Sequence, residues 1–215
     1  MSGGADGRRP VELGHASRLV NHGPTVLVCT EHQGRRNVMA AAWSMPVEFT
    51  PPRIAVVIDK QTTTAALAQA SGRLALCVPG AALADLCTTV GQTRGADLFE
   101  QGLDKFRHYG IAHFAGPVLG LPLIEGCAAW MECRVMPEPH TQSAYDTWFV
   151  EVVSAQADAR IFREGRWQIT EENADLHTLH HLGAGTYAVA SRTLGSRHLK
   201  PVDGPSAGPE IQLQR

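Results

Sequence analysis

The chain has 215 residues, of which 44% are hydrophobic and 19% are charged, and its formal net charge is −2 with histidine neutral. This length favours one substantial domain, and the near balance of basic and acidic residues, without a basic run, argues against binding to a nucleic-acid backbone. No secretory leader and no apolar run of the ~20 residues needed to span a membrane is present, so we expect a cytoplasmic protein with no membrane contact.

The two ends of the chain differ in composition from the middle. Residues 1–17 are small, polar and rich in Gly, and residues 195–215 contain several Gly and Pro with few large apolar side chains. We expect both segments to be loosely held or to pack against a partner, and place one domain at 18–194. The five cysteines are odd in number and lack CxxC spacing, which predicts buried thiols.

Three strands are predicted within the first sixty residues. Residues 25–30 are a β-branched apolar run, and residues 37–43 follow after a polar turn that contains Gly34, which indicates a hairpin. Two prolines then precede residues 53–58, an apolar run too short for a typical helix. We interpret this third run as a buried strand.

Short helices and one further strand are predicted in the next part of the chain. Residues 62–70 are rich in Ala and Leu, begin at a threonine and end before Ser71 and Gly72, which is typical of a capped helix. A strand is predicted at 74–78 and a helix at 81–90. Residues 91–121 are rich in glycine and predicted to be irregular, a length of loop that is usually functional.

The last third of the domain contains the longest predicted strands. These are residues 123–136 and residues 145–157, followed by a tight turn at 164–166 and a helix at 174–182. The chain thus has five to seven strands with inserted short helices, without regular alternation of strand and helix. This pattern predicts a mainly β, antiparallel barrel.

The segment from Asp59 to Thr64 is the first candidate binding site. Thr62, Thr63 and Thr64 stand at the start of the predicted helix, beside Lys60. Hydroxyls and free amides at a positive helix end, with a nearby ammonium group, suit a phosphate or another anion. Threonine at this boundary equally suits simple capping of the helix, and spacing does not separate the two interpretations.

A second candidate is the predicted strand at 37–43, which contains three consecutive alanines followed by Trp43. Small side chains beside an aromatic ring allow a planar ligand to approach the backbone. The alternative is that a neighbouring helix packs closely there, and composition slightly favours it.

Other motifs give weaker signals. The chain has neither GxGxxG after its first strand nor GxxxxGK[ST], so any phosphate is held in another way. His177, His180 and His181 form HxxHH on the predicted last helix, but the glutamate of the HExxH pattern is missing and no metal site is predicted. No arrangement of Ser, His and Asp or of Cys and His supports a nucleophile.

The order of these pieces resembles one family over about two thirds of the chain. The matching stretches are PTVLVCTEHQGRRNVMAAAWSMPVEFTPPRIAVVIDK, QTTTAALAQASGRLALCVP, LDKF, PLIEGCAAWMECRV and YDTWFVEVV. In this order they resemble the flavin reductase-like proteins with an FMN-binding split barrel, a group that includes flavoredoxin and the reductase components of two-component monooxygenases.

The resemblance implies a six-stranded, Greek-key-like split barrel that forms a homodimer, with FMN, or FAD as the other possible flavin, near the subunit interface. It implies that the isoalloxazine ring is lined by Asn37, Met39, Ala42, Trp43 and Ser44. It further implies that the ribityl chain and phosphate are bound by Lys60, Thr62, Thr63 and Thr64, helped by Thr88 or Thr89 and by Lys105.

The chain departs from the family at two places. The segment from Cys87 to Lys105 is longer than usual, and Thr63 replaces the tyrosine that the family has in its DKxxYT pattern, which removes an aromatic wall from the ligand.

The activity implied by the resemblance is the transfer of hydride from NAD(P)H to bound flavin and then of electrons to an acceptor, with no catalytic side chain. The alternatives are an electron carrier of flavoredoxin type without its own NAD(P)H site, and a barrel that no longer binds flavin. A monooxygenase or another electron-transfer protein is the partner implied.

Overall fold

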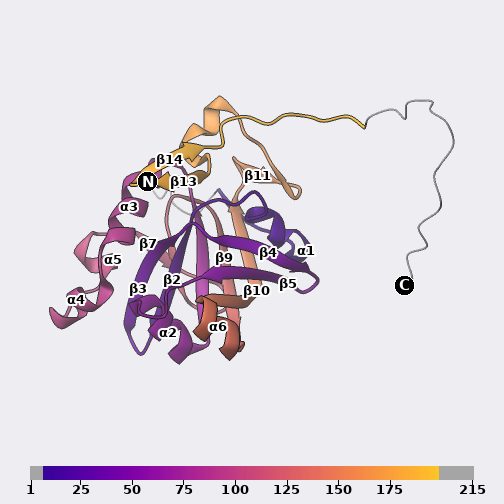
Figure 1. The fold of residues 1–215 in the computed structure, drawn as a ribbon. Helices are drawn as coiled ribbons and strands as arrows, with labels where there is room; N and C mark the ends of the chain where they lie inside the picture. The colour runs from indigo at the N-terminus through magenta and orange to yellow at the C-terminus, as the bar shows by residue number, and fades with distance from the viewer. Residues whose placement is uncertain (1–6, 199–215) are drawn as a thin grey trace, which may run out of the picture.

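The fold is an antiparallel sheet that curls into a barrel, with helices outside it (Figure 1). The computed structural model describes residues 7–198, so residues 1–6 and 199–215, which include most of the predicted C-terminal tail, lie outside the described part. The main sheet has the order β3-β2-β6-β9-β10-β5-β4, and β1 pairs with β10. Its strands are β1 Arg8–Pro10, β2 Val26–His32, β3 Arg35–Ala41, β4 Ser44–Phe49, β5 Pro52–Val57, β6 Arg73–Pro79, β9 Cys127–Met136 and β10 Thr147–Asp158.

Two residues, Ala42 and Trp43, connect the first and the last strand of this order. Since β3 ends at Ala41 and β4 begins at Ser44, the sheet has to curl until its two edges meet at this corner. The Trp43 carbonyl accepts a hydrogen bond from the Val57 amide at 3.0 Å, which holds the corner against β5. The fold class predicted from the sequence, a mainly β split barrel with short helices, is confirmed.

The central strands are buried on both faces, which explains why their sequences are continuous apolar runs. Val28, Leu76 and Met131 point into the barrel and belong to its core. On the other face, Cys77 and Trp130 of neighbouring strands pack in a second cluster beneath the helices. The predicted burial of thiols is confirmed, because all five cysteines are free and buried.

The helices and the remaining strands are short. The helices are α1 Leu13–Ala16, α2 Thr63–Ser71, α3 Ala84–Gln92, α4 Gly95–Glu100, α5 Lys105–His108 and α6 Pro139–Tyr145, with 3-10 turns at Ser17–Leu19, Ala81–Leu83 and Glu171–Leu176. The other strands are β7 His113–Ala115, β8 Pro122–Ile124, β11 Phe162–Arg163, β12 Arg166–Trp167, β13 Leu179–Gly183 and β14 Thr186–Val189. No helix in residues 7–198 is long and apolar enough to cross a membrane.

Helix α2 begins and ends as its sequence predicts. The Thr62 hydroxyl accepts a hydrogen bond from the Ala65 amide, and Gly72 follows the helix in the left-handed conformation with φ of 68°. Both signals are local, so they can be recognised without knowledge of the fold.

Replacing Gly72 with alanine is expected to lower the free energy of unfolding by about 1 kcal/mol, because a Cβ is disfavoured at this φ. No other atom lies within 4 Å of the position of that Cβ, so the effect is confined to the backbone. Urea denaturation of the variant and of Gly14→Ala, where the space is also open and φ is not positive, measures it. Equal destabilisation by both substitutions would contradict this account of the helix end.

The predicted helix at 174–182 is wrong. The 3-10 turn ends at Leu176, and the chain then becomes extended through β13. The physical reason is tertiary: Leu179 is buried, and its carbonyl accepts a hydrogen bond from the Thr25 amide at 2.7 Å. The stretch at 91–121, predicted to be irregular, contains α4, α5 and β7.

Two further segments were missed at the sequence level. The edge strand β4 was not predicted, and neither was α6, which lies in the connection before the strand predicted at 145–157; that strand is β10. The long strand predicted at 123–136 is divided into β8 and β9 by a turn at Gly126, whose φ is 79°.

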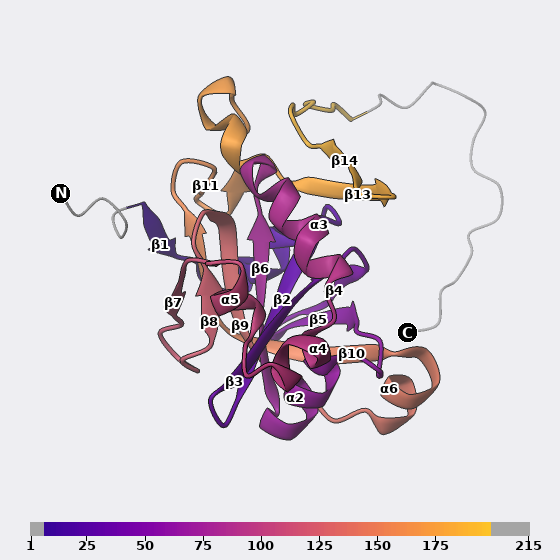
Figure 2. The same cartoon turned by 90° about the vertical axis from the view of Figure 1, so that its left-hand side faces the viewer.

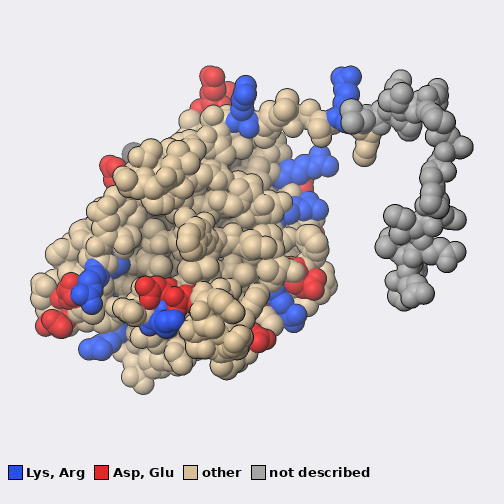
Figure 3. Space-filling view, viewed as in Figure 1, with Lys and Arg blue, Asp and Glu red and all other residues tan. Residues whose placement is uncertain are grey.

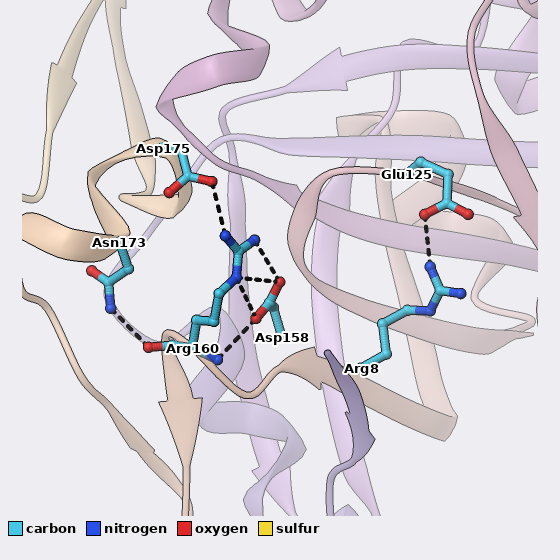
Figure 4. A network of polar contacts seen from close by, with 6 residues as sticks. All are labelled: Arg8, Glu125, Asp158, Arg160, Asn173 and Asp175. Atoms are coloured by element: carbon cyan, nitrogen blue, oxygen red, sulfur yellow. Dashed lines mark hydrogen bonds and ion pairs between the residues drawn. The ribbon is translucent and has the colours of Figure 1, made fainter. Parts of the chain in front are cut away.

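Residues 8–17, expected to be loosely held, form β1 and α1 against the sheet. The guanidinium of Arg8 donates to Glu125 at 2.6 Å, close to a second network in which Arg160 bridges Asp158 at 2.9 Å and Asp175 at 3.4 Å (Figure 4). These ion pairs join the first strand and the segment after β10 to the rest of the barrel.

Candidate functional site

A pocket of about 450 Å³ lies where the start of α2, strand β3 and the junction of α3 and α4 meet. Figure 2 shows these elements on the same side of the molecule, with α4 beside α2 and α3 above them. We call this cavity the α2 pocket. Six of the twelve residues predicted as cofactor-binding line it, namely Asn37, Met39, Thr62, Thr63, Thr64 and Lys105.

The floor of the α2 pocket is the first turn of α2. Thr62 closes the helix by accepting from the Ala65 amide at 3.1 Å, and its hydroxyl donates to the Asp59 carbonyl at 2.7 Å. The amides of Thr63 and Thr64 have no intrahelical carbonyl to which they can donate, since they belong to the first turn. Capping by Thr62 therefore leaves the amides of Thr63 and Thr64 as donors at the pocket. Helix capping and anion binding, the two interpretations of this segment, are thus compatible.

Asn37 brings an unsatisfied acceptor to the same pocket. Its amide nitrogen donates to the Thr64 hydroxyl at 2.9 Å, while its Oδ1 is buried without a hydrogen-bond partner. The residue is only 2% exposed. Buried polar atoms without partners are uncommon, so this oxygen is placed to accept a hydrogen bond from a bound molecule.

The wall opposite α2 comes from the segment between Cys87 and Lys105, the part in which the chain departs from the family pattern. Thr93, Arg94 and Gly95 line the pocket there. A Cβ on Gly95 would lie 2.5 Å from Asn37 Oδ1 and 3.1 Å from the Thr63 hydroxyl, so only glycine lets the chain approach these two groups this closely. These three residues were not predicted from the sequence. The one feature that could have indicated them is the Arg94–Gly95 pair, in a stretch predicted to be irregular.

Lys105 is the buried cation of the site. It is 2% exposed, and its ammonium group donates to the carbonyl oxygens of Val38 at 2.8 Å and Val90 at 2.7 Å. Burial lowers the pKa of Lys105 to about 8, which still leaves it mainly protonated at neutral pH. The lysine thus ties β3 to α3 and gives the α2 pocket a positive wall.

A second cavity, of about 310 Å³, lies between α3 and the hairpin of β13 and β14, and we call it the hairpin pocket. Ala42 and Thr88, two more of the predicted residues, line it. The two pockets share Ala40, Gly91 and Gln92 in their walls, so they are adjoining parts of one site. The helix predicted at 174–182 covers only His181 of the hairpin residues that line this pocket, and Ala184, Gly185 and Tyr187, which follow it, were not predicted as site residues.

Four predicted residues line neither pocket. Trp43 is 74% exposed at the corner of the sheet, and the Ser44 hydroxyl is buried without a partner. Lys60 points toward α6, where its ammonium group donates to the Ser143 carbonyl and pairs with Asp146 at 3.3 Å. The Thr89 hydroxyl donates to the Asp85 carbonyl at 2.7 Å.

The geometry suits an elongated ligand with an anionic end and a flat uncharged part. Donors of the α2 turn, Arg94 and Lys105 surround the first part, and the small side chains of Ala40 and Ala42 leave room for the second. Among residues 7–198 no group of three or more His, Cys, Asp or Glu side chains is placed to hold a metal ion.

Comparison with known proteins identifies the family. Residues 18–170 match the model of the flavin reductase like domain. This chain belongs to that family. The resemblance stated from the sequence is confirmed. The matched residues include both walls of the α2 pocket and every strand of the main sheet except β1, whereas β13 and β14 follow them.

Similar proteins are found among sequences and structures. The uncharacterized protein YddH of Escherichia coli (strain K12) is 54% identical over 186 residues, which cover 85% of this chain and 95% of that protein. An FMN-binding domain of a flavin reductases-like enzyme from Shewanella baltica OS155 has a TM-score of 0.84 and 37% identity, covering 88% of this chain and 97% of that one. Flavoredoxin of Desulfovibrio vulgaris (Miyazaki F) shares the fold, with a TM-score of 0.67 and 22% identity over 81% of this chain and 90% of its own.

Proposed function

We propose that this protein is an FMN-dependent oxidoreductase that takes hydride from NADH or NADPH and passes electrons to free flavin or another acceptor. The observation that carries the proposal is the α2 pocket, in which the first turn of α2, Arg94 and Lys105 converge beside the unsatisfied Oδ1 of Asn37. Membership of the flavin reductase-like family and the likeness to an FMN-binding domain from Shewanella baltica support it.

The residues of the α2 pocket match the chemistry of FMN. A phosphate needs donors and positive charge, which the amides of Thr63 and Thr64, together with Arg94 and Lys105, supply. A ribityl chain brings hydroxyl donors, and Asn37 Oδ1 is an acceptor without a partner. Gly95 lets the chain pass close beside Asn37 and Thr63, two of the residues that line this pocket.

Flavin, when bound, supplies the redox chemistry, and the protein supplies orientation and electrostatics. Ala40 and Ala42 allow the flat part of the cofactor to approach β3. Lys105 holds a positive charge near the site while remaining anchored to two main-chain carbonyls, so its position does not depend on the ligand.

The test is steady-state oxidation of NADH and of NADPH by the purified protein with FMN added. The proposal expects oxidation that requires both protein and FMN and saturates with the nicotinamide. A protein that binds FMN but oxidises neither nicotinamide faster than free FMN does would contradict the proposal and favour an electron carrier of flavoredoxin type.

We also propose that the protein is a homodimer, formed through the outer face of β4. Met45 is 59% exposed and lies opposite Ala55 of β5, which in turn lies opposite Phe149 of β10. Val47, in the bulge of β4, is 44% exposed, and the charged pair of Glu48 and Arg53, which lie opposite each other, follows at the edge of this face. Figure 3 shows that this side of the molecule is largely free of Lys, Arg, Asp and Glu side chains, which gather toward its edges. A second copy of the chain is the occupant that suits this apolar face.

Replacing Met45 with lysine is expected to raise the dissociation constant of the dimer by at least about tenfold, because each dimer would bury two lysines. Sedimentation velocity at several protein concentrations measures the change. Val118→Lys introduces the same charge at an exposed apolar residue outside β4 and should leave the dimer intact. A wild-type protein that sediments as a monomer at all concentrations would contradict this proposal.

A further inference from the structure

The short helix that carries Lys105 is held in place by charged side chains outside both pockets. Helix α5 has four residues, and a helix of one turn is not stable by its own hydrogen bonds. Asp104 is its N-cap, and Asp104 Oδ1 accepts a hydrogen bond from the Arg107 amide at 2.8 Å. The position of Lys105 therefore depends on this cap and on the contacts of α5 with neighbouring elements.

The other carboxylate oxygen of Asp104 connects the cap to β3. Arg36 Nε donates to Asp104 Oδ2 at 3.0 Å, and the two side chains are 24% and 12% exposed. A hydrogen-bonded ion pair at this depth is less weakened by solvent than an exposed one. Arg36 immediately precedes Asn37 on β3, and Asp104 immediately precedes Lys105. The pair thus joins the chain next to two residues to which we assign FMN binding.

Two further contacts fix the Arg36 guanidinium. Its Nη1 donates to His113 Nε2 at 2.7 Å, so the His113 proton is on Nδ1, which donates to the Ile111 carbonyl at 3.0 Å. Its Cζ also lies 5.1 Å from the centre of the Phe106 ring, which is buried in the cluster beneath the helices. Since Phe106 belongs to α5, Arg36 contacts this segment at its cap and at its buried side chain.

Lys105 itself requires an accurate position. Its ammonium group has three N–H donors, and the hydrogen bonds to the carbonyl oxygens of Val38 and Val90 use two of them. One donor is left for a ligand in the α2 pocket, which Lys105 lines. A displacement of α5 away from β3 would turn this donor aside and admit water to a group that is now 2% exposed.

We propose that Arg36 and Asp104 are positioning residues, which hold α5 against β3 so that the Lys105 ammonium group faces the α2 pocket and stays out of water. The proposal rests on the proposed function, in which Lys105 contributes to FMN binding. Arg36 and Asp104 line neither the α2 pocket nor the hairpin pocket, so both act through Lys105 and not on the cofactor.

The first measurement is the titration of the Lys105 side chain by NMR in the protein without FMN. The sequence contains three lysines, and comparison with Lys105→Met assigns the signal. Burial lowers the pKa of Lys105 to about 8, so the wild-type signal should titrate near that pH. In Arg36→Met and in Asp104→Ala the midpoint should move above about pH 9, because a loosened α5 lets water reach the ammonium group.

The two variants together separate positioning from a direct effect of charge. Loss of the Arg36 charge alone would raise the pKa of Lys105, whereas loss of the Asp104 charge alone would lower it. Loosening of α5 raises the pKa in both variants. A midpoint that Asp104→Ala lowers or leaves unchanged would overturn the proposal, as would an unchanged midpoint in Arg36→Met. Should Asp104→Ala not fold, Asp104→Asn takes its place, since asparagine keeps an oxygen for the cap.

The second measurement is the dissociation constant of FMN at pH 7. Each variant is expected to raise it about fivefold, less than Lys105→Met does, because the lysine keeps its charge and loses only its place. The double variant Arg36→Met with Asp104→Ala should bind FMN no more weakly than Asp104→Ala alone, because both residues act through one contact. Additive losses in the double variant would contradict that shared role.

Arg8→Met is the matched control. Arg8 forms a 2.6 Å ion pair with Glu125 whose side chains are 17% and 37% exposed, and its Cζ lies 3.9 Å from the centre of the Phe114 ring. It thus resembles Arg36 in burial and in its aromatic contact but lies outside both pockets. This variant should leave the Lys105 midpoint at its wild-type value and change the affinity for FMN by less than about twofold.

Thermal midpoints show whether each variant is folded at the temperature of the titrations. A folded Arg36→Met protein with wild-type affinity for FMN would overturn the proposal, and so would an equal loss of affinity in Arg8→Met. A wild-type protein that takes up no FMN refutes the proposed function instead. The titration of Lys105 needs no flavin, so it decides separately whether the ion pair positions this lysine.

Discussion

Replacing Gly95 with alanine is expected to raise the dissociation constant of FMN about 100-fold, which corresponds to about 2.7 kcal/mol. The new Cβ would lie 2.5 Å from Asn37 Oδ1 and 3.1 Å from the Thr63 hydroxyl, so at least one of these groups has to move. Asn37 is held to Thr64 by a 2.9 Å hydrogen bond, and its displacement disturbs the first turn of α2 as well. The substitution thus shifts groups to which we assign the binding of FMN.

The measurement is a titration of the apoprotein with FMN, followed by quenching of flavin fluorescence. Overpacking also costs stability, about 1–3 kcal/mol, so the thermal midpoint of the variant has to be recorded to show that it is folded at the titration temperature. Gly14→Ala, on α1 where nothing lies within 4 Å of the new Cβ, is the matched control. A folded Gly95→Ala protein with wild-type affinity would show that FMN does not use this pocket.

Replacing Lys105 with methionine is expected to weaken FMN binding by about 10-fold to 100-fold, because a charge-assisted contact is worth about 1.5–3 kcal/mol. Methionine fills much of the same volume but leaves the carbonyl groups of Val38 and Val90 without the ammonium donor. The variant therefore removes the positive wall of the α2 pocket with a small change in shape.

Because Lys105 titrates near the experimental pH range, we expect the affinity for FMN to depend on pH. Burial lowers its pKa to about 8 in the free protein, and a bound phosphate, being an anion, favours the protonated form. Binding above pH 8 therefore takes up a proton, and the dissociation constant should rise with pH, by up to about tenfold per unit. Titrations from pH 7 to 9.5 should show this rise in wild type and none in Lys105→Met.

The matched control for this substitution is Lys60→Met. The sequence places Lys60 near the phosphate, whereas the structure directs its ammonium group to Ser143 and Asp146 beside α6. FMN affinity should change by less than about threefold, since the pair is exposed and outside the α2 pocket. If Lys60→Met weakens FMN binding more than Lys105→Met does, our assignment of the phosphate-binding lysine is wrong.

Much of the barrel could be predicted from sequence because its signals are local or repeat along the chain. Strand β2 begins with an apolar run rich in β-branched residues, and α2 has a threonine cap and a terminal glycine. The cap and the glycine reflect local backbone preferences that do not depend on distant contacts, and the β-branched residues suit a buried strand. The helix predicted at 174–182 failed because the buried side chain and backbone hydrogen bond of Leu179 stabilise an extended chain there.

The residues of the candidate site were likewise predicted only in part. Asn37 and the threonines of α2 lie on segments whose type is correctly predicted, and the structure brings them together. Gly95 and Tyr187 were missed because their roles depend on the packing of α4 against α2 and of the hairpin against α3. Lys60 and Lys105 look alike in sequence, and only burial and hydrogen-bond partners separate them.

The most direct test of the central claim is the visible absorption spectrum of the purified protein with FMN, recorded without oxygen before and after NADH or NADPH is added. We expect the spectrum of a bound oxidised flavin that bleaches when one of the nicotinamides is added. A spectrum identical to that of free FMN, with no uptake by the protein, would contradict the assignment of the α2 pocket. Bound flavin that neither nicotinamide bleaches would contradict the proposed reaction while leaving the site in place.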